Sequence, residues 1–395
     1  MTKIFLSEMC AEPIHGGGIT LERILSCELE NFNWFIKVVH YRNEPKVFSH
    51  RLERYITFPF GYQAKWLEKI LGCTLTYKIF RSNLVRRLHS ENIATQLFKR
   101  NVINPNSKLL VCPQGEFTLY TVQRLRCMAN VRYITWVMDD HLVRWSKNGW
   151  MYHPDHEDLM KEHLQHAEQV FVISPELQNF YQQRFGIKSE VLFAPCNNLA
   201  EPIYKFIGED TKIRFAYFGS IGPWQQDALE LLLTLVKQDI IKLDIFTNDQ
   251  YSLPSVFQST GVVLRKPVSS NQVTQVMRNY DAVVIPISFR QDLRHMSCFN
   301  IATKMAECMG SGIPTVVIGP SDSAMVKFLL PHDAAVLITE INEAQIKDAV
   351  IQLRDPTQRL RILNNAQRLA KEELNHTRMQ LKWKSASQWL NLDLD

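Results

Sequence analysis

The sequence lacks the features that mark several large classes of protein. None of its eight cysteines forms a C-x-x-C pair, and no zinc-ligand spacing is present, so reduced core thiols are expected. No apolar run approaches the roughly 20 residues that span a bilayer, and the first residues are interrupted too soon to form a secretory leader. Low-complexity segments and short repeats are also missing. We therefore expect a soluble, cytoplasmic, globular protein with at most a peripheral contact at the inner face of the membrane.

The charge balance is close to even, which argues against a dedicated nucleic-acid binder. Lys plus Arg number 45 and Asp plus Glu number 40, for a formal charge of +5 over 395 residues. An excess this mild favours anionic partners in general and predicts no nucleic acid. The length, about twice that of a large single domain, predicts two domains.

Short β-branched or aliphatic runs alternate with longer amphipathic stretches, which is typical of parallel α/β architecture. Six runs fall in each half of the chain: Lys3–Leu6, Phe35–Tyr41, Leu109–Cys112, Tyr133–Met138, Val170–Ile173 and Val191–Phe193, then Arg214–Phe218, Lys242–Phe246, Val262–Leu264, Ala282–Ile285, Thr315–Ile318 and Ala334–Ile338. Two such series predict two doubly wound, Rossmann-like domains. Residues 46–99 are aromatic and basic without a clear period, and they predict no elements.

We expect the first domain at residues 1–195, a linker at 196–212 and a second domain at 213–375. The linker follows from the turn-forming residues between Ala194 and Pro202. Residues 376–395 predict a further helix that carries Trp383 and Trp389. This helix either packs on its own domain or crosses back to the first one.

The densest motif runs from Ala302 to Ile318. Residues Ala302–Met309 predict a helix that ends at Gly310, with Lys304 and Glu307 on one face. An ammonium one turn inside a helix N-terminus suits a phosphate, and a carboxylate three residues later suits the hydroxyls of a ribose. An ordinary amphipathic helix with solvated charges is the alternative.

Together with Tyr280–Pro286, this motif resembles the donor-nucleotide region of GT-B glycosyltransferases, and above all the glycosyl transferases group 1 family. The resemblance implies that Lys304 contacts the donor diphosphate and that Glu307 holds the ribose. Many family members have an acidic residue eight positions before this glutamate, where this sequence has Phe299. The sugar-hydroxyl contact would then pass to the backbone of Asn300 to Ala302.

Two further segments extend the resemblance. Arg214–Ile221 resembles the first strand of the family's donor domain, which implies a glycine turn at Gly219 beneath the diphosphate. The family usually places a cation after this turn, whereas residues 222–227 here read Gly-Pro-Trp-Gln-Gln-Asp. Arg290 and Arg294 are the candidate replacements, with a solvated loop as the alternative. Val170–Leu177 resembles the strand-and-serine segment that closes the acceptor-side domain.

In the first half, His15 is followed by three glycines between a predicted strand and a predicted helix. Exposed amides in such a turn can hold an anion, although a tight turn required by packing explains the glycines equally well. In GT-B enzymes a glycine-rich loop at this place touches donor phosphate or acceptor. The resemblance therefore implies donor-binding roles for Gly17 and Gly18.

A second polar segment follows the strand Tyr133–Met138, where Asp139, Asp140 and His141 stand in a row. The carboxyl ends of parallel strands face the functional crevice, and adjacent ionisable groups can shift a pKa or orient a base. The family has His-Asp at the end of this strand. A helix-capping aspartate with a surface histidine is the alternative, and Gln114–Glu116 is a similar crevice candidate.

These observations predict a GT-B glycosyltransferase with two domains facing a cleft. It would transfer a hexose from a nucleotide-diphospho-sugar to a glycan, a lipid-linked or a protein acceptor, with retention and without a cofactor or metal. Lys304, Asp140 and His141 are the expected catalytic residues, and the one Asp-x-Asp match is Asp393 to Asp395. A sugar-nucleotide epimerase of the same fold and a non-catalytic nucleotide-sugar-binding module remain as alternatives.

Overall fold

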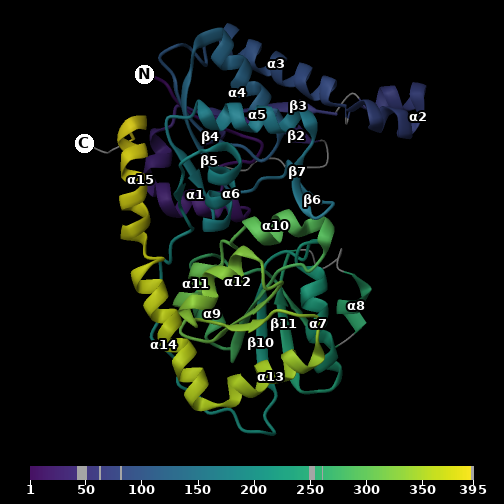
Figure 1. The fold of residues 1–395 in the computed structure, drawn as a ribbon, viewed down its shortest axis with the longest axis vertical. Helices are drawn as coiled ribbons and strands as arrows, with labels where there is room; N and C mark the ends of the chain where they lie inside the picture. The colour runs from purple at the N-terminus through teal and green to yellow at the C-terminus, as the bar shows by residue number, and fades with distance from the viewer. Residues whose placement is uncertain (42–50, 62–63, 81, 249–253, 260, 393–395) are drawn as a thin grey trace. The chain divides into compact units, whose positions relative to one another are not determined.

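The computed structural model describes residues 1–395 except 42–50, 62–63, 81, 249–253, 260 and 393–395 (Figure 1). The Asp-x-Asp match at Asp393 and Asp395 thus lies outside the described residues. The chain divides into two compact units. Unit 1 comprises Met1–Ile173, Leu177–Leu192 and Gln380–Asp395, and unit 2 comprises Ser174–Glu176 and Phe193–Met379.

Unit 1 is built on a parallel sheet with the strand order β3-β2-β1-β4-β5-β8-β9. Its strands are β1 (Lys3–Ser7), β2 (Trp34–Tyr41), β3 (Tyr55–Phe60), β4 (Lys108–Cys112), β5 (Arg132–Val137), β8 (Val170–Val172) and β9 (Glu190–Val191). The aliphatic runs are buried on both faces, as a sheet covered by helices on both sides requires. The strand order reverses between β1 and β4, and in such sheets ligands bind at this switch point.

Helices connect these strands. They are α1 (Gly16–Leu25), α2 (Ala64–Phe80, with a kink at Gly72), α3 (Asn83–Lys99), α4 (Glu116–Ala129), α5 (Pro154–Gln165), α6 (Pro175–Phe185) and the short 3-10 turns Ser26–Asn31 and Leu52–Arg54. A small antiparallel hairpin, β6 (Val143–Ser146) and β7 (Gly149–Tyr152), follows β5. Neither β3 nor this hairpin was predicted from the sequence.

Unit 2 repeats the design with the strand order β12-β11-β10-β13-β14-β15. Its strands are β10 (Ile213–Phe218), β11 (Ile241–Phe246), β12 (Val263–Arg265), β13 (Ala282–Pro286), β14 (Thr315–Ile318) and β15 (Val336–Ile338). All of its pairs are parallel, and the switch point lies between β10 and β13. Leucines of the first helix and aliphatic residues of β10, β13 and β14 form the core.

The helices of unit 2 are α7 (Gln226–Lys237), α8 (Ser255–Ser259), α9 (Val273–Met277), α10 (Arg294–Phe299), α11 (Met305–Gly310), α12 (Ala324–Leu329), α13 (Glu343–Arg354) and α14 (Pro356–Glu372), with 3-10 turns at Gln291–Leu293 and Leu330–His332. None of the described helices of either unit is long and apolar enough to cross a membrane.

The last helix, α15 (His376–Leu390), begins in unit 2, and its residues from Gln380 onward belong to unit 1. Trp383 is 1% exposed and packs on Trp136 and Phe171 at ring-centroid distances of 6.2 and 5.5 Å. Its indole N–H donates to Glu28 at 2.8 Å. The crossing of the C-terminal helix back to the first domain is therefore confirmed.

Candidate functional site

The switch point of unit 2 carries a lysine. The ammonium of Lys304 donates a hydrogen bond to the carbonyl oxygen of Phe218, the last residue of β10, at 2.6 Å. It also lies 4.2 Å from the centroid of the Tyr217 ring, close enough for a cation–π contact. The structure thus brings together two motifs that the sequence separates by 86 residues.

Gly219 follows directly, and its role here is to leave space. A side-chain carbon at this position would lie 2.7 Å from the Lys304 nitrogen, and φ is +143°, a region that side chains rarely adopt. Its own N–H donates to the carbonyl oxygen of Phe246 at 2.9 Å. Gly219 therefore admits the lysine to the end of β10, while its amide is already engaged.

The surroundings of Lys304 change its acidity. Burial lowers the pKa of its ammonium to about 8, and Cys308 and Glu307 partly oppose this shift. The side chain is only partly exposed, and at neutral pH it keeps its charge. A solvated lysine on a helix would show neither these contacts nor this pKa shift. The alternative of an ordinary amphipathic helix with solvated charges therefore does not describe Lys304.

The helix around this lysine is shorter than the sequence predicted, and that expectation was wrong. Helix α11 begins at Met305, so Lys304 occupies the capping position and not the first turn inside. The preceding helix, α10, ends at Phe299, and Asn300 has an extended backbone. Glu307 stands in the first turn of α11 and is partly exposed, and Ala302 lies in the connection between the two helices.

Phe299 stands at the position where many members of the family have an acidic residue, and it is buried in this chain. Phe299 is 4% exposed, and its carbonyl oxygen accepts a hydrogen bond from the hydroxyl of Ser174. Ser174 belongs to the strand-and-serine segment recognised in the sequence. The phenyl ring supplies no charge to the site, so a sugar would have to meet backbone groups here.

Both arginines that were candidates for the missing phosphate cation, Arg290 and Arg294, already form ion pairs. Arg290 forms a two-point ion pair with Asp292, at 3.0 Å from its Nε and 2.7 Å from its Nη2. Arg294 pairs with Asp322. For Arg290, about half exposed, the solvated-loop interpretation fits this placement.

Hydrogen bonds of its own polar groups hold the segment after Gly219 in place. Gln225 accepts from the N–H of Gly222 at 3.1 Å, and the carbonyl oxygen of Trp224 accepts from Ser288 at 3.0 Å. Asp227 accepts from the N–H of Phe289 at 2.8 Å. Where the family usually has a cation, this chain has residues that tie the loop after β10 to the loop after β13.

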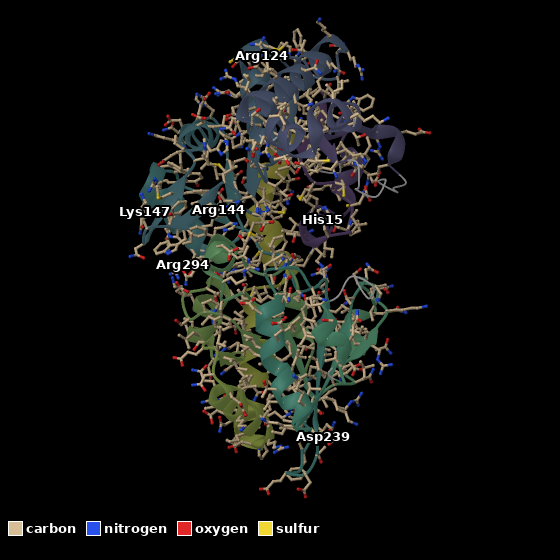
Figure 2. All side chains as sticks on the ribbon, turned by 90° about the vertical axis from the view of Figure 1, so that its right-hand side faces the viewer. His15, Arg124, Arg144, Lys147, Asp239 and Arg294 are labelled. Carbon is tan, nitrogen blue, oxygen red and sulfur yellow. The ribbon has the colours of Figure 1, made fainter. Side chains whose placement is uncertain are left out.

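In unit 1, packing explains the glycine-rich turn. A side-chain carbon at Gly18 would lie 1.8 Å from the carbonyl oxygen of Glu12, and one at Gly17 would lie 2.6 Å from the sulfur of Met9. The ring of His15, labelled in Figure 2, accepts from the N–H of Gly18 at 3.2 Å and so caps α1. Burial lowers the pKa of this imidazole. The tight-turn interpretation is therefore sufficient, and a donor role for Gly17 and Gly18 stays a prediction.

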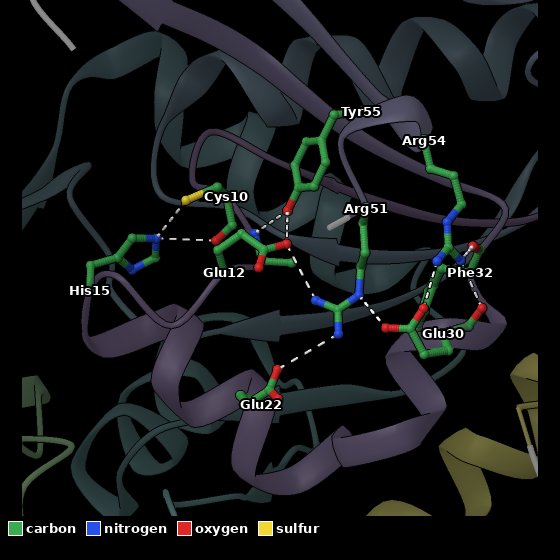
Figure 3. Close-up of polar contacts among 10 residues, drawn as sticks. Cys10, Glu12, His15, Glu22, Glu30, Phe32, Arg51, Arg54 and Tyr55 are labelled. Atoms are coloured by element: carbon green, nitrogen blue, oxygen red, sulfur yellow. Dashed lines mark hydrogen bonds and ion pairs between the residues drawn. The ribbon is translucent and has the colours of Figure 1, made fainter. Parts of the chain in front are cut away.

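An ion-pair network holds this loop in place (Figure 3). The buried guanidinium of Arg51 contacts Glu12 at 3.3 Å, Glu30 at 2.7 Å and Glu22 at 3.9 Å. The hydroxyl of Tyr55 donates to Glu12 at 3.1 Å. Arg51 lies in the region that showed no periodicity, so no sequence pattern indicated this network.

The ionisable residues that follow β5 have different surroundings in the structure. Asp140 is 3% exposed and accepts from the N–H of Leu142 at 2.9 Å and from the hydroxyls of Tyr152 and Tyr181 at 2.6 and 2.9 Å. Both of its oxygens thus serve the fold, which leaves none free for a proton-transfer role. Burial raises the pKa of its neighbour Asp139, whereas His141 and His15 oppose that shift.

A cavity of about 690 Å³ opens at the switch point of unit 1. It is lined by Glu8, Gln114 and His141, which follow β1, β4 and β5, and by Glu116 at the start of α4. The missed hairpin adds Arg144, which is labelled in Figure 2. The pKa of Glu8 is raised by burial, although its carboxylate accepts hydrogen bonds from the N–H groups of Gln114 and Thr118. No cluster that could hold a metal ion occurs among the described residues.

The chain has two doubly wound parallel sheets, each with its own switch point, and a C-terminal helix that returns to the first unit. This combination defines the GT-B fold. Solved structures share it: sucrose-phosphate synthase from Thermosynechococcus elongatus matches with a TM-score of 0.67 and 13% identity, covering 99% of each chain. HepE from Anabaena in complex with UDP matches at 0.62 and 13%, covering 98% of this chain and 100% of its own. TarM from S. aureus matches at 0.63 and 11%, covering 99% of each chain. No protein-family model and no curated protein matches the sequence.

Proposed function

We propose that the chain is a glycosyltransferase that moves a sugar from a nucleotide-diphospho-sugar to a glycan, lipid-linked or protein acceptor. The observation that carries the proposal is the ammonium of Lys304, held by the Phe218 carbonyl oxygen beside Gly219 at the switch point of unit 2. HepE, which shares the fold, has been solved with UDP and with UDP-glucose, and TarM with UDP. Unit 2 would accordingly bind the donor.

The proposed chemistry is departure of a nucleoside diphosphate from the sugar. Negative charge grows on the diphosphate as the bond breaks, and a cation fixed beforehand stabilises the transition state more than the ground state. The Phe218 carbonyl and the Tyr217 ring hold Lys304 in place before any ligand arrives. Glu307, in the first turn of α11, would accept the ribose hydroxyls.

Retention is the proposed stereochemistry, because it requires no strong protein base. Asp140, one of the expected catalytic residues, is fully occupied by Leu142, Tyr152 and Tyr181. His141 lines the cavity of unit 1 and is the better placed of the two to meet an acceptor. We further propose hexosyl transfer without a metal ion.

A non-catalytic nucleotide-sugar-binding module is the second candidate. The buried phenyl group of Phe299 and the ion pairs of Arg290 and Arg294 favour it, because they leave fewer charged groups for the sugar and the phosphate. A module would bind the donor without turning it over in the presence of any acceptor.

Thermal unfolding with a series of UDP-, GDP-, dTDP- and ADP-sugars tests the proposal, because a ligand that binds the folded state raises its apparent stability. At least one donor should raise the melting temperature. Glu307→Gln should weaken that nucleotide by about 1–3 kcal/mol through the loss of charge-assisted hydrogen bonds. No response to any donor would contradict the proposal, and activity lost with EDTA and restored by manganese would contradict metal independence.

A further inference from the structure

Helices α2 and α3 of unit 1 present large apolar side chains to solvent. Ile70 and Leu75 on α2 are 60% and 47% exposed, and Leu84 and Leu88 near the start of α3 are 66% and 54% exposed. Isolated exposed leucines are ordinary on protein surfaces. Here three leucines and one isoleucine are exposed on two consecutive helices, and the fold itself does not use them.

The packing of the two helices shows why these residues are left out. Helix α3 buries Ser90, Ile93, Ala94 and Leu97, the stripe that faces α4 and the core of unit 1. Leu84 and Leu88, four residues apart, share a different face. Helix α2 extends away from the rest of unit 1 in Figure 1.

The same stretch concentrates positive charge. Residues 64–100 contain eight lysines and arginines against two glutamates, a net charge of +6 that exceeds the +5 of the whole chain. Lys69 and Lys78 are exposed on α2, beside Ile70 and Leu75. The exposed side chains of Lys69, Ile70, Leu75, Lys78, Leu84 and Leu88 are called the α2–α3 surface below.

We propose that the α2–α3 surface binds the face of an anionic phospholipid bilayer. Exposed apolar side chains can enter the boundary between headgroups and acyl chains, while lysines beside them are attracted to negative headgroups. A second copy of this chain fits less well, because a symmetric contact would bring together two copies of residues 64–100, each with a net charge of +6. Charge complementarity thus selects the lipid over self-association.

This inference does not depend on the donor chemistry proposed for unit 2. It adds a partner to a face of unit 1 that lines neither the cavity nor the glycine-rich turn. A glycosyltransferase held in this way would meet lipid-linked acceptors at the bilayer face. Membrane binding and nucleotide binding can therefore fail separately.

Co-sedimentation of the full chain with vesicles is the test. The chain should bind vesicles that contain phosphatidylglycerol, bind phosphatidylcholine vesicles far more weakly, and be released by high salt. Lys69→Gln with Lys78→Gln should lower the partition coefficient about thirtyfold, since each lysine near an anionic surface contributes roughly fivefold. Leu84→Gln with Leu88→Gln should lower it at least about tenfold through lost apolar burial.

Matched controls come from exposed residues elsewhere. Leu381→Gln, at a leucine 65% exposed on α15, and Lys161→Gln with Lys371→Gln should leave vesicle binding unchanged. Circular dichroism and nucleotide-induced stabilisation should stay normal in every variant, which shows that each one folds. Equal binding to neutral vesicles, no binding to anionic ones, or a dimer abolished by the leucine changes would overturn the proposal.

Discussion

The two units have the same architecture and treat their strand ends in opposite ways. In unit 1, the N-terminus of α4 is occupied by the carboxylate of Glu8, and that of α1 by the imidazole of His15. In unit 2, the end of β10 receives the ammonium of Lys304. In unit 1 the N–H groups at two helix N-termini are taken up by the chain's own acceptors, whereas in unit 2 a cation lies at the end of the first strand.

This contrast shows how little of the function resides in the fold. Both sheets reverse their strand order beside the first strand, so both offer a switch point where a ligand could bind. A carboxylate already in place repels an anionic ligand, and a lysine attracts one. On the proposed function, the side chains at the strand ends would decide which unit suits a diphosphate.

The largest expected effect comes from removing that cation. Lys304→Ala should lower turnover by about 10²–10³, or roughly 2.7–4 kcal/mol, and should change the donor Michaelis constant less. Lys304→Arg should restore only part of the rate, because a planar fork does not fit the space beside Gly219. Steady-state kinetics with the preferred donor measure this.

The exposed Lys371 on α14 provides the matched control, since Lys371→Ala should behave like the parent protein. Near-normal turnover of the Lys304→Ala protein would remove the contrast between the units and leave a shared fold alone.

The next effect concerns the stability of unit 1. Arg51→Met leaves Glu12 buried without its cation and should lower the free energy of unfolding by about 2–4 kcal/mol. Arg54→Met is the control, because Arg54 is more exposed and pairs with the same Glu30, so a loss under about 1 kcal/mol is expected. Urea denaturation of both proteins measures the difference. Equal losses would mean that Arg51 acts as an ordinary surface residue.

The pKa of about 8 for Lys304 predicts a pH dependence of donor binding. A bound diphosphate favours the protonated amine, so affinity should be constant below pH 8 and fall by up to about tenfold per pH unit above it. Binding should take up a proton in that range. Calorimetry in buffers of different ionisation enthalpy measures the uptake, which should vanish in Lys304→Met.

The stability of the unliganded fold changes with pH in the opposite direction to the donor affinity. Because the folded-state pKa lies below the ordinary value of 10.5, the charge costs folding free energy at neutral pH. That cost is relieved as the pH rises from about 8 toward 10.5, so the Lys304 contribution to stability increases over this range. A donor affinity that rises above pH 8 would contradict the proposed role of this ammonium.

The smallest expected effect comes from a substitution that makes the strand ends of unit 1 more like those of unit 2. Glu8→Ala frees the N–H groups of Gln114 and Thr118 at the start of α4, where an anion gains about 0.3–1 kcal/mol. Sulfate should then stabilise the variant slightly more than the parent at equal ionic strength, as thermal unfolding can measure. A Lys304→Ala background removes the contribution of unit 2. An identical response of both proteins would show that Glu8 blocks nothing.

The sequence predicted the strands whose residues are apolar throughout, because burial on both faces leaves a continuous aliphatic run. It missed β3, which contains Pro59 and lies at an edge of the sheet, and the hairpin β6–β7. The hairpin had a usable signal, since Asn148 and Gly149 mark a tight turn between two short strands.

The candidate site was predictable as residue types and not as geometry. Lys304 was singled out by its motif, but its partner, the Phe218 carbonyl, lies far away in sequence. Asp140 looked like a base because the two tyrosine hydroxyls that satisfy it come from later elements. Only folding reveals which ionisable groups are already occupied.

The helix α15 has a consequence for how the chain is made. Trp383 completes the core of unit 1, yet it follows the whole of unit 2 in the chain. On the ribosome, residues 1–192 emerge long before this tryptophan does, so unit 1 still lacks a large core side chain while most of unit 2 is being made. The part made first would then wait for nearly the whole chain, and until Trp383 arrives Trp136 and Phe171 present an open apolar site to chaperones.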